Sequence, residues 1–447
     1  MKIQTLKELR AGEYVGTQKL KLTSCGLTEF PLEILDLADS LEVLDLSGNP
    51  LSTLPDDISR LHNLKIAFFS DCKYAHFPTQ LAQCRSLEMV AFRGNRMTAI
   101  DEGAFPPQLR WLILTNNNIE SLPRSIGQCH RLQKVMLAGN RLTTLPDEMA
   151  KCNKLGLLRI SVNRITYLPK WLFTLPELSF LAFAGNPCAP SFEDNPELDD
   201  IAWSDLSVDD ILGEGASGVI YKGTCRSKQN GKTKAMAVAI KLFKGSVTSD
   251  GSPADEMVAC ITAGSHPSLI DPIGKIHGYP EGKGGLVLQL IPPSYSNLGL
   301  PPTLQSCTRD SFPPGTFFSS KKYIITILRS IASAAAHLHA KGISHGDLYA
   351  HNVLIDETGH ALLGDFGAAT IYRKSDANLE AIERLEVLAF GHLVEDLFGL
   401  VDYKTIDKEG VFVDTLKRLH CRCAQPVVKD RPSFVEICKV LDNFEVV

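Results

Sequence analysis

Leucines recur at fixed intervals through the first 190 residues of the chain. The segments LEVLDLSGNPLSTLP, LRWLILTNNNIESLP, LQKVMLAGNRLTTLP and LGLLRISVNRITYLP share the pattern LxxLxLxxNxLxxLP. One position of this pattern is Asn or Cys, and consecutive units place it 22 to 24 residues apart. The positions are Cys25, Asn49, Cys72, Asn95, Asn117, Asn140, Asn163 and Asn186. Chance does not preserve such a frame through eight units, so the pattern predicts a stack of short repeats.

Each predicted repeat consists of one short strand and the turn that follows it. Its leucines point inward, and the Asn or Cys side chain can bond to the backbone of the turn. Because no unit can bury its apolar face alone, the stack supplies the core. Three cysteines each precede a repeat's first leucine by three residues: Cys84, Cys129 and Cys152. This recurrence predicts a buried column of thiols rather than a metal site.

Residues between the strand leucines are expected to face the concave side of the stack. Many of them are bulky or basic: Phe68, Met89, Trp111, Ile113, Met136, Leu157 and Phe180, with Arg93, Lys134 and Arg159 beside them. Single exposed apolar side chains are normal on a protein surface. Seven on one face instead favour a docking surface, either for a protein partner or for the second half of this chain.

The leucine frame stops after the acidic segment NPCAPSFEDNPELDD, and a different pattern begins. ILGEGASGVIYKG places Gly213, Gly215 and Gly218 between β-type residues, and the strand-like AMAVAIKLF follows. The pattern GxGxxG also occurs in dinucleotide-binding folds, but there a helix begins directly after it. Here VIYKGTC continues as a strand, which favours a glycine-rich hairpin. GLVLQLIPP predicts a further strand and KKYIITILRSIASAAAHLHAKG a long helix, while the Pro/Ser-rich residues 299–320 are expected to form a surface loop.

The candidate chemistry lies in HGDLYAHNVLIDETGHALLGDFG, residues 345–367. Asp347 and Asn352 lie five residues apart, and Asp365 follows Asp347 by 18 residues, which leaves room for one hairpin. Carboxylate and amide oxygens are the ligands that Mg²⁺ prefers, and another carboxylate can accept a hydroxyl proton. The segment therefore has the residue types that phosphoryl transfer requires.

With these motifs in this order, the second half resembles a tyrosine-kinase-like serine/threonine protein kinase, and the first half resembles a leucine-rich repeat array. The C-terminal segment CAQPVVKDRPSFVEICKVL is similar to the end of such kinase domains. The resemblance implies an α/β leucine-rich repeat solenoid followed by an α+β two-lobed kinase-like domain. It places the solenoid, eight repeats with an N-terminal cap in TLKELRAGEY, at residues 1–195, a linker at 196–204 and the kinase-like domain at 205–447.

The same resemblance implies ATP and Mg²⁺ as cofactors and gives roles to individual residues. Lys241 would hold the α- and β-phosphates, with Glu256, or less favourably Asp255, as its acidic partner. Asp347 would receive the substrate's hydroxyl proton, and Asn352 and Asp365 would bind Mg²⁺. Lys241, Asp347 and Asn352 form the implied catalytic set. The implied nucleotide-binding residues are Leu212, Gly213, Gly215, Gly218, Ile220, Ala239, Lys241, Glu256, Gln289, Ile291 and Leu354, with Leu288 as the gatekeeper.

The chain departs from the kinase pattern on the side of the phosphate acceptor. Gly346 stands where the family has an arginine that binds activation-loop phosphate, and Tyr349 replaces a lysine. Glu386, which replaces the usual Asp, follows Asp365 by only 21 positions, so the activation segment is short. Activity is therefore expected not to depend on phosphate at Thr370, Tyr372 or Ser375, because the usual partner is absent.

Composition mainly excludes other classes of protein. The 447 residues are 44% hydrophobic and 22% charged, as in ordinary globular proteins, and the net charge of −5 argues against nucleic acid as the main partner. The N-terminus lacks the apolar core of a signal peptide, and no run of eighteen apolar residues occurs, so no membrane span and a cytoplasmic location are expected. The 12 scattered cysteines are expected to be free thiols.

Three functions fit these observations. The first is an ATP-dependent protein serine/threonine kinase whose repeats recruit the protein substrate or a regulator. The second is a small-molecule phosphotransferase, because HGDLYAHN is also similar to the His-Gly-Asp loop of aminoglycoside and choline kinases. The third is a nucleotide-binding pseudokinase scaffold. The substrate, the ligand of the repeats and the oligomeric state are not encoded in any recognisable motif.

Overall fold

The computed structural model of the chain forms two compact units. It describes residues 4–190, 198–215, 217–229, 232–245, 247–282, 284–373, 379–402 and 410–444. The first unit comprises Met1–Leu178 with Asn186–Cys188, and the second comprises Ser179–Gly185 with Ala189–Val447. The division therefore differs from the predicted boundary at residue 195, because residues 179–185, which hold the strand of the eighth repeat, group with the second unit.

The first unit is a ladder of short parallel strands, as the leucine pattern predicts. Helix α1, Leu6–Arg10, begins after Thr5, whose side chain accepts a hydrogen bond from the backbone of Glu8. The strands are β1 Lys19–Lys21, β2 Val43–Asp45, β3 Ile66–Phe68, β4 Met89–Ala91, β5 Trp111–Ile113, β6 Lys134–Met136 and β7 Leu157–Arg159. Each pairs with the next in parallel, so that Leu44 lies between Leu20 and Ala67.

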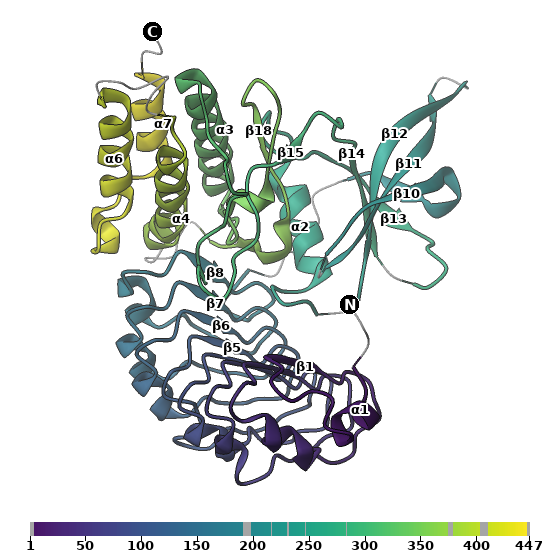
Figure 1. The fold of residues 1–447 in the computed structure, drawn as a ribbon. Coiled ribbons are helices and arrows are strands. Elements are labelled where there is room, and N and C mark those ends of the chain that lie inside the picture. The colour runs from purple at the N-terminus through teal and green to yellow at the C-terminus, as the bar shows by residue number, and fades with distance from the viewer. Residues whose placement is uncertain are drawn as a thin grey trace. The chain divides into compact units, whose positions relative to one another are not determined.

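Short 3₁₀ turns lie opposite the strands of this ladder (Figure 1). Within the first unit they are η1 Leu32–Leu37, η2 Ile58–Arg60, η3 Thr79–Gln83, η4 Arg124–Gln128, η5 Asp147–Lys151 and η6 Lys170–Thr174. Several of them begin after a proline, which cannot donate a ladder hydrogen bond. The predicted cysteine column ends three of these turns, and Cys84, Cys129 and Cys152 are buried free thiols as expected.

The asparagines bond to the turn backbone as the repeat pattern predicts. Asn49 is buried, its amide donates to the carbonyls of Leu22 and Leu46, and its oxygen accepts from the N–H groups of Cys25 and Leu27. Asn117 and Asn140 make the same kind of contacts in later repeats. Because a buried amide is costly unless it is bonded, this network holds each turn in one conformation.

The predicted concave residues are only partly accessible. In the first unit Phe68, Trp111, Ile113 and Met136 are half-buried, and the ammonium of Lys134 lies 4.4 Å from the centre of the Trp111 ring. Phe180 is buried within the second unit, so of the two expected occupants of this face it meets the second half of the chain and is not accessible to a separate protein partner.

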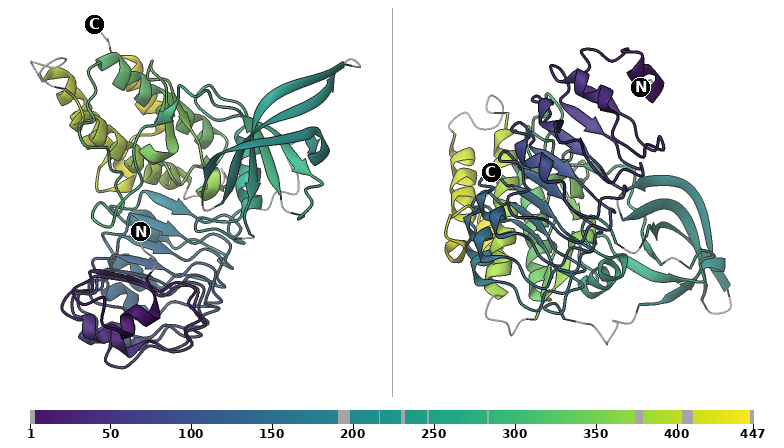
Figure 2. Two further views of the ribbon diagram at one scale, coloured as in Figure 1. Left: turned by 45° about the vertical axis from the view of Figure 1, so that its right-hand side comes forward. Right: turned by 90° about the horizontal axis from the view of Figure 1, so that it is seen from below.

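The second unit begins with a six-stranded sheet. Its strands are β9 Asp200–Ala202, β10 Leu206–Glu214, β11 Gly218–Gln229, β12 Lys232–Phe243, β13 Pro272–His277 and β14 Gly285–Gln289, in the order β10-β11-β12-β14-β13-β9. Figure 2 shows β10 to β12 as long twisted strands that extend away from the helices of this unit. Residues 200–202, which were expected in the linker, pair with β13. The core of the sheet includes Val238, Ile240 and Val287.

Helices and short strands form the rest of the second unit (Figure 1). They are α2 Pro253–Ala263, α3 Lys321–Ala340, α4 Leu379–Gly399, α6 Val411–Cys423 and α7 Phe434–Asp442, with the 3₁₀ turns η7 Trp203–Asp205, η8 Ala350–Asn352, η9 Phe366–Ala368 and η10 Val428–Asp430. Short strands lie near them: β8 Phe180–Ala182, β15 Ser296–Asn297, β16 Ile343–Ser344, β17 Val353–Ile355, β18 Ala361–Leu363 and β19 Thr370–Ile371. This sheet and this set of helices agree with a two-lobed kinase architecture.

Two further expectations can be compared with the described residues. In the part of the chain that the structure covers, no helix has both the length and the apolar character needed to cross a bilayer. The Pro/Ser-rich residues 299–320 are not a simple surface loop, because Cys307 is fully buried and Leu300 and Ser311 exchange backbone hydrogen bonds of 2.7 and 3.1 Å.

Candidate active site

Lys241 and Glu256 form a buried ion pair between the sheet and α2. Lys241 lies on β12 and its ammonium contacts the Glu256 carboxylate, while both side chains are less than a tenth exposed. Burial alone would lower the pKa of Lys241, but the charges of Glu256 and Asp365 outweigh it and raise that pKa, so the ammonium stays protonated. The alternative partner, Asp255, instead accepts a 2.6 Å hydrogen bond from Ser252, which caps α2.

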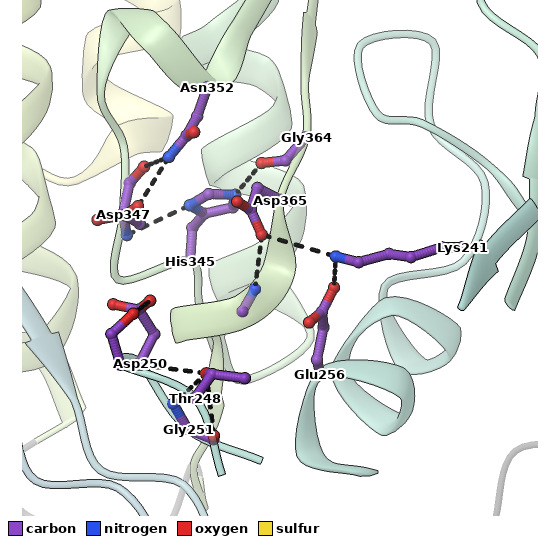
Figure 3. A network of polar contacts seen from close by, with 12 residues as sticks. Lys241, Thr248, Asp250, Gly251, Glu256, His345, Asp347, Asn352, Gly364 and Asp365 are labelled. Atoms are coloured by element: carbon purple, nitrogen blue, oxygen red, sulfur yellow. Dashed lines mark hydrogen bonds and ion pairs between the residues drawn. The ribbon is translucent and has the colours of Figure 1, made fainter. Parts of the chain in front are cut away.

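Asp365 approaches this pair from the other side of the cleft (Figure 3). Its Oδ1 lies 3.9 Å from the Lys241 Nζ and accepts a 3.2 Å hydrogen bond from the backbone of Gly367. The residue has φ +56°, a left-handed conformation that Asp tolerates better than most residues but that still costs energy. Its side chain is about half exposed at 53%, so the carboxylate can bind a ligand in the cleft.

Asp347 and Asn352 bond to each other across one turn of the loop before β17 (Figure 3). The Asn352 amide donates to the Asp347 backbone carbonyl at 3.0 Å and to its Oδ2 at 2.7 Å. Since the amide nitrogen is used in this way, the amide oxygen of Asn352 is left to accept from or coordinate another group. The 3₁₀ turn η8 brings Asn352 back towards Asp347.

His345 and Glu386 fix the backbone that carries Asp347. The Nε2 of His345 lies 2.8 Å from the Gly364 carbonyl, and its Nδ1 accepts from the backbone of Asp347 at 3.3 Å. Glu386 of α4 accepts from the N–H groups of His345 and Gly346 at 3.2 and 2.6 Å. Burial would raise the pKa of Glu386, but the hydrogen bond and charge of His339 hold it below its ordinary value, so the carboxylate stays ionised. Glu386, which is longer than the Asp of the kinase pattern, thus accepts hydrogen bonds from two backbone amides of the loop.

A pocket lies between the glycine-rich hairpin, α2 and the residues around Asp365. Five predicted nucleotide-binding residues line it: Gly215, Gly218, Ile220, Lys241 and Glu256. Its lining also contains the expected gatekeeper Leu288, the metal candidate Asp365, and residues that were not predicted: Ser217, Cys260, Ile270, Leu286, Gly364 and Phe366. Gly218 permits the close approach of β11 to β12, because a Cβ there would collide with the Leu242 carbonyl.

The other predicted nucleotide-binding residues do not line this pocket. Among the described residues, its lining does not include Leu212, Gly213, Ala239, Gln289, Ile291 or Leu354. Ala239 on β12 is paired with Leu288, and Gln289 is the last residue of β14. Leu354 lies on β17, and Leu212 and Gly213 lie on β10. Their assignment to the adenine site therefore stays a prediction.

The acceptor side of the loop explains why Gly346 stands in place of an arginine. Gly346 has φ +71°, and a Cβ on it would lie 2.7 Å from the Ala368 carbonyl oxygen and 2.9 Å from that of Leu181. Both oxygens belong to backbone and cannot move aside as a flexible side chain could. No L-residue with a side chain therefore fits here without strain.

Tyr349 is held by Phe180. The two rings stack with centroids 3.9 Å apart and an angle of 9° between their planes, and Tyr349 is only 4% exposed. The backbone of Phe183 donates a 3.1 Å hydrogen bond to the Thr370 hydroxyl. The repeat frame placed Phe180 on a face expected to dock a protein partner or the second half of this chain, but no sequence signal indicated Tyr349 as the residue that it contacts.

Two of the hydroxyl residues at which phosphate was expected to have no effect on activity are enclosed. Thr370 is fully buried, and Tyr372 is 8% exposed, with its hydroxyl 2.7 Å from the Nδ1 of His339. Ser375 lies outside the described residues. A kinase acting on this chain therefore meets neither Thr370 nor Tyr372 in the folded state.

Comparison with known proteins identifies both halves of the chain. The family described as protein tyrosine and serine/threonine kinase matches residues 206–387, and the leucine-rich repeat family matches residues 40–61 and 108–129. These regions fall on the second unit and on the strand ladder respectively.

The similar proteins of known name include protein kinases and a receptor. Serine/threonine-protein kinase TNNI3K of Homo sapiens is 26% identical over 186 residues, 39% of this chain and 19% of that protein. Fibroblast growth factor receptor 1 of Dugesia japonica is 26% identical over 271 residues, 52% of this chain and 31% of the receptor. Probable cyclin-dependent kinase 10 of Dictyostelium discoideum is 27% identical over 199 residues, 44% and 48% of the two chains. The matches thus span between about a fifth and a half of these relatives.

Proposed function

The chain combines leucine-rich repeats with a protein tyrosine and serine/threonine kinase domain, and on this premise we propose that it transfers the γ-phosphoryl group of ATP to serine or threonine hydroxyls of a protein. The observation that carries the proposal is the convergence of Lys241, Glu256 and Asp365 in the cleft, together with the hydrogen-bonded pair Asp347 and Asn352. Phosphoryl transfer requires such a set, because catalysis depends on positioning and on charge stabilisation.

Each residue then has a defined task. The Lys241 ammonium, held by Glu256, binds the α- and β-phosphates. Asp347 accepts the proton of the attacking hydroxyl, and its carboxylate is oriented by the amide of Asn352. Gly213 and Gly215 of the glycine-rich hairpin have open space where a Cβ would be, so phosphates can approach their backbone closely.

The donor set fits Mg²⁺. Among the described residues no cluster of three His, Cys, Asp or Glu side chains could enclose a metal ion alone. Mg²⁺ usually takes one or two protein oxygens and completes its shell with phosphates and water. The half-exposed carboxylate of Asp365 and the amide oxygen of Asn352 supply such a pair. Bound there, the ion would offset the negative charge of the phosphates.

The protein acceptor is proposed to be held by the repeats. Glu386 follows Asp365 by only 21 positions, which leaves little chain for a peptide-binding platform. The half-buried Trp111, whose ring contacts the ammonium of the buried Lys134, offers an apolar surface in the first unit. A bound protein tethered to the same chain is present at a high effective concentration.

The test of transfer is incubation of the full chain with γ-labelled ATP, Mg²⁺ and a panel of generic protein substrates. We expect labelled serine and threonine by phosphoamino acid analysis, and no label with Asp365→Ala. Labelled tyrosine would overturn the hydroxyl class. Efficient labelling of an aminoglycoside or of choline, without protein labelling, would establish the small-molecule alternative.

Recruitment is tested with a protein that the chain labels and with a short peptide that contains the labelled site. We expect the intact protein to be the better substrate, and Trp111→Ala to reduce its labelling while peptide labelling stays unchanged. Glu177→Ala, a substitution at a residue elsewhere in the first unit, serves as control. Equal labelling of protein and peptide would contradict a recruiting role.

A further inference from the structure

The Pro/Ser-rich residues 299–320 form an ordered bridge in the second unit. Leu300 and Ser311 pair through their backbones, and Thr303 and Ser306 bond to each other across a turn. Cys307, which lies between Leu300 and Ser311 in sequence, is fully buried. A segment with this many internal bonds is placed accurately enough to position other groups.

Arg309, near the middle of these residues, anchors the bridge on α4. Its guanidinium contacts Glu395 at 2.6 Å, contacts Asp396, and donates to the His392 carbonyl at 3.3 Å. Guanidinium groups bound to two carboxylates hold a fixed geometry. The same helix carries Glu386, which holds the amides of His345 and Gly346. The anchor and the catalytic loop therefore share one rigid support.

The next residue, Asp310, bonds to the catalytic loop with both carboxylate oxygens. Its Oδ2 accepts from the backbone N–H of Ala350, and its Oδ1 lies 2.7 Å from the Nδ1 of His351. The Asp310 side chain is 4% exposed. Burying a carboxylate is costly unless it is fully bonded, so these two contacts are a built feature of the fold.

The contacts of Asp310 fall between the two residues of the candidate catalytic pair. Ala350 begins the 3₁₀ turn η8, and its N–H has no partner within that turn, so a carboxylate satisfies and orients it. His351 immediately precedes Asn352, whose amide holds the Asp347 carboxylate at 2.7 Å. A shift of this turn would move Asn352 away from Asp347.

We infer that Asp310 is a positioning residue for phosphoryl transfer: by fixing Ala350 and His351 it keeps Asn352 bonded to Asp347. This inference rests on the proposed function for its effect on turnover, and on the contacts alone for its effect on the loop. Small misplacements of reacting groups lower the rate strongly, whereas nucleotide binding also depends on Lys241 and on the glycine-rich hairpin, which Asp310 does not touch.

The test compares full-length Asp310→Asn, Asp310→Ala and Asp310→Glu. Asn keeps an acceptor for Ala350 but loses the charge that faces His351, so kcat should fall about tenfold; Ala removes both contacts, and kcat should fall about a hundredfold. KM for ATP should stay within about twofold of wild type in both. Glu should restore part of kcat, because it can bond to both partners. Asp414→Asn, an exposed Asp on α6, is the matched control and should behave as wild type.

Hydrogen exchange separates this inference from the proposed function. In Asp310→Ala, peptides covering residues 346–353 should lose protection, while peptides from α4 and β12 keep it. Unchanged exchange in 346–353 would overturn the inference even if the wild-type chain shows no transfer at all. Equal loss of protection throughout the second unit, or a rise in KM that accounts for the whole loss of activity, would also overturn it, because Asp310 would then only support the fold. Absence of transfer by wild type with the expected exchange result would count against the proposed function alone.

Discussion

The two sides of the catalytic loop are built in different ways. On the nucleotide side, Lys241, Glu256, Asn352 and Asp365 come from motifs that follow the order of the kinase pattern, and Lys241 meets Glu256 and Asp365 in the cleft. On the acceptor side, Gly346 and Tyr349 depart from the pattern.

The acceptor side is completed by residues that are distant in sequence. Phe180 precedes Tyr349 by 169 residues and stacks on its ring, and Asp310 precedes Ala350 by 40 residues. Phosphates and Mg²⁺ demand the same ligands in every such site, so that side is constrained by chemistry. The acceptor side has only to be rigid and correctly shaped, which different residues can achieve. The comparison can be tested by changing one side at a time.

The largest effects are expected on the nucleotide side. Asp347→Asn should lower turnover at least about a hundredfold, the usual cost of losing a proton acceptor, while ATP affinity is retained. Asp365→Ala should in addition weaken Mg-ATP binding, measured by calorimetry. Asp356→Asn, in the turn after β17, serves as control. Wild-type turnover in Asp347→Asn would remove this residue from the catalytic set.

On the acceptor side, Gly346→Ala should destabilise the second unit by about 1–3 kcal/mol, because the new Cβ meets two backbone carbonyls. Gly278→Ala is the matched control, since Gly278 has φ +74° with open space around it and so isolates the backbone conformation from the collision. Urea denaturation of both variants measures the difference. Equal losses would mean that Gly346 is required only for its φ.

Acid should lower the free energy of unfolding of the second unit through His392 of α4. Burial, assisted by the charges of Arg309 and its neighbours, lowers the pKa of His392 to about 3. The unfolded chain binds this proton near pH 6.5, so the free energy of unfolding should fall as pH drops below 6.5, by about 1.4 kcal/mol per pH unit until pH 3. Denaturation between pH 7.5 and 5.5, across which the total loss from His392 should be about 1.4 kcal/mol, measures this dependence, and His392→Gln should reduce the loss. An identical slope in the variant would exclude His392 as the cause.

The stack of Phe180 on Tyr349 should contribute a smaller coupling energy. A double-mutant cycle with Phe180→Leu and Tyr349→Leu should give about 0.5–1.5 kcal/mol, the range of aromatic pairs beyond their buried area. Phe69 and Phe92, whose rings stack at 5.1 Å in the first unit, provide a control pair outside the site. Additive losses from the two single variants would show that the rings are packed but not coupled.

Phosphatase treatment is expected to have no effect on turnover. Thr370 and Tyr372 are buried, and Gly346 provides no cation for a phosphate. Comparing initial rates of treated and untreated protein checks this. A large fall in rate after treatment would mean that a phosphate elsewhere controls the site.

The sequence by itself determined the elements with a repeating or local physical cause. The leucine period predicted the parallel ladder, because each strand buries its leucines only against its neighbours. The recurring Asn position predicted that these side chains bond to the backbone of the turns. The spacing of Asp347, Asn352 and Asp365 indicated one site, because a short loop and one hairpin leave the backbone few ways to arrange them, but it did not predict the hydrogen bond between Asn352 and Asp347.

Only the tertiary structure decided what supports the acceptor side. Phe180 belongs to the repeat frame by sequence, yet its strand groups with the second unit, and the period of a repeat contains no information about where its last member packs. Asp310 lies in the Pro/Ser-rich segment that composition predicted as a surface loop. Composition indicates turns, but it contains no information about which residues those turns contact. The contacts of these residues span many positions of the chain, so they depend on how distant elements pack and cannot be inferred from neighbours in sequence.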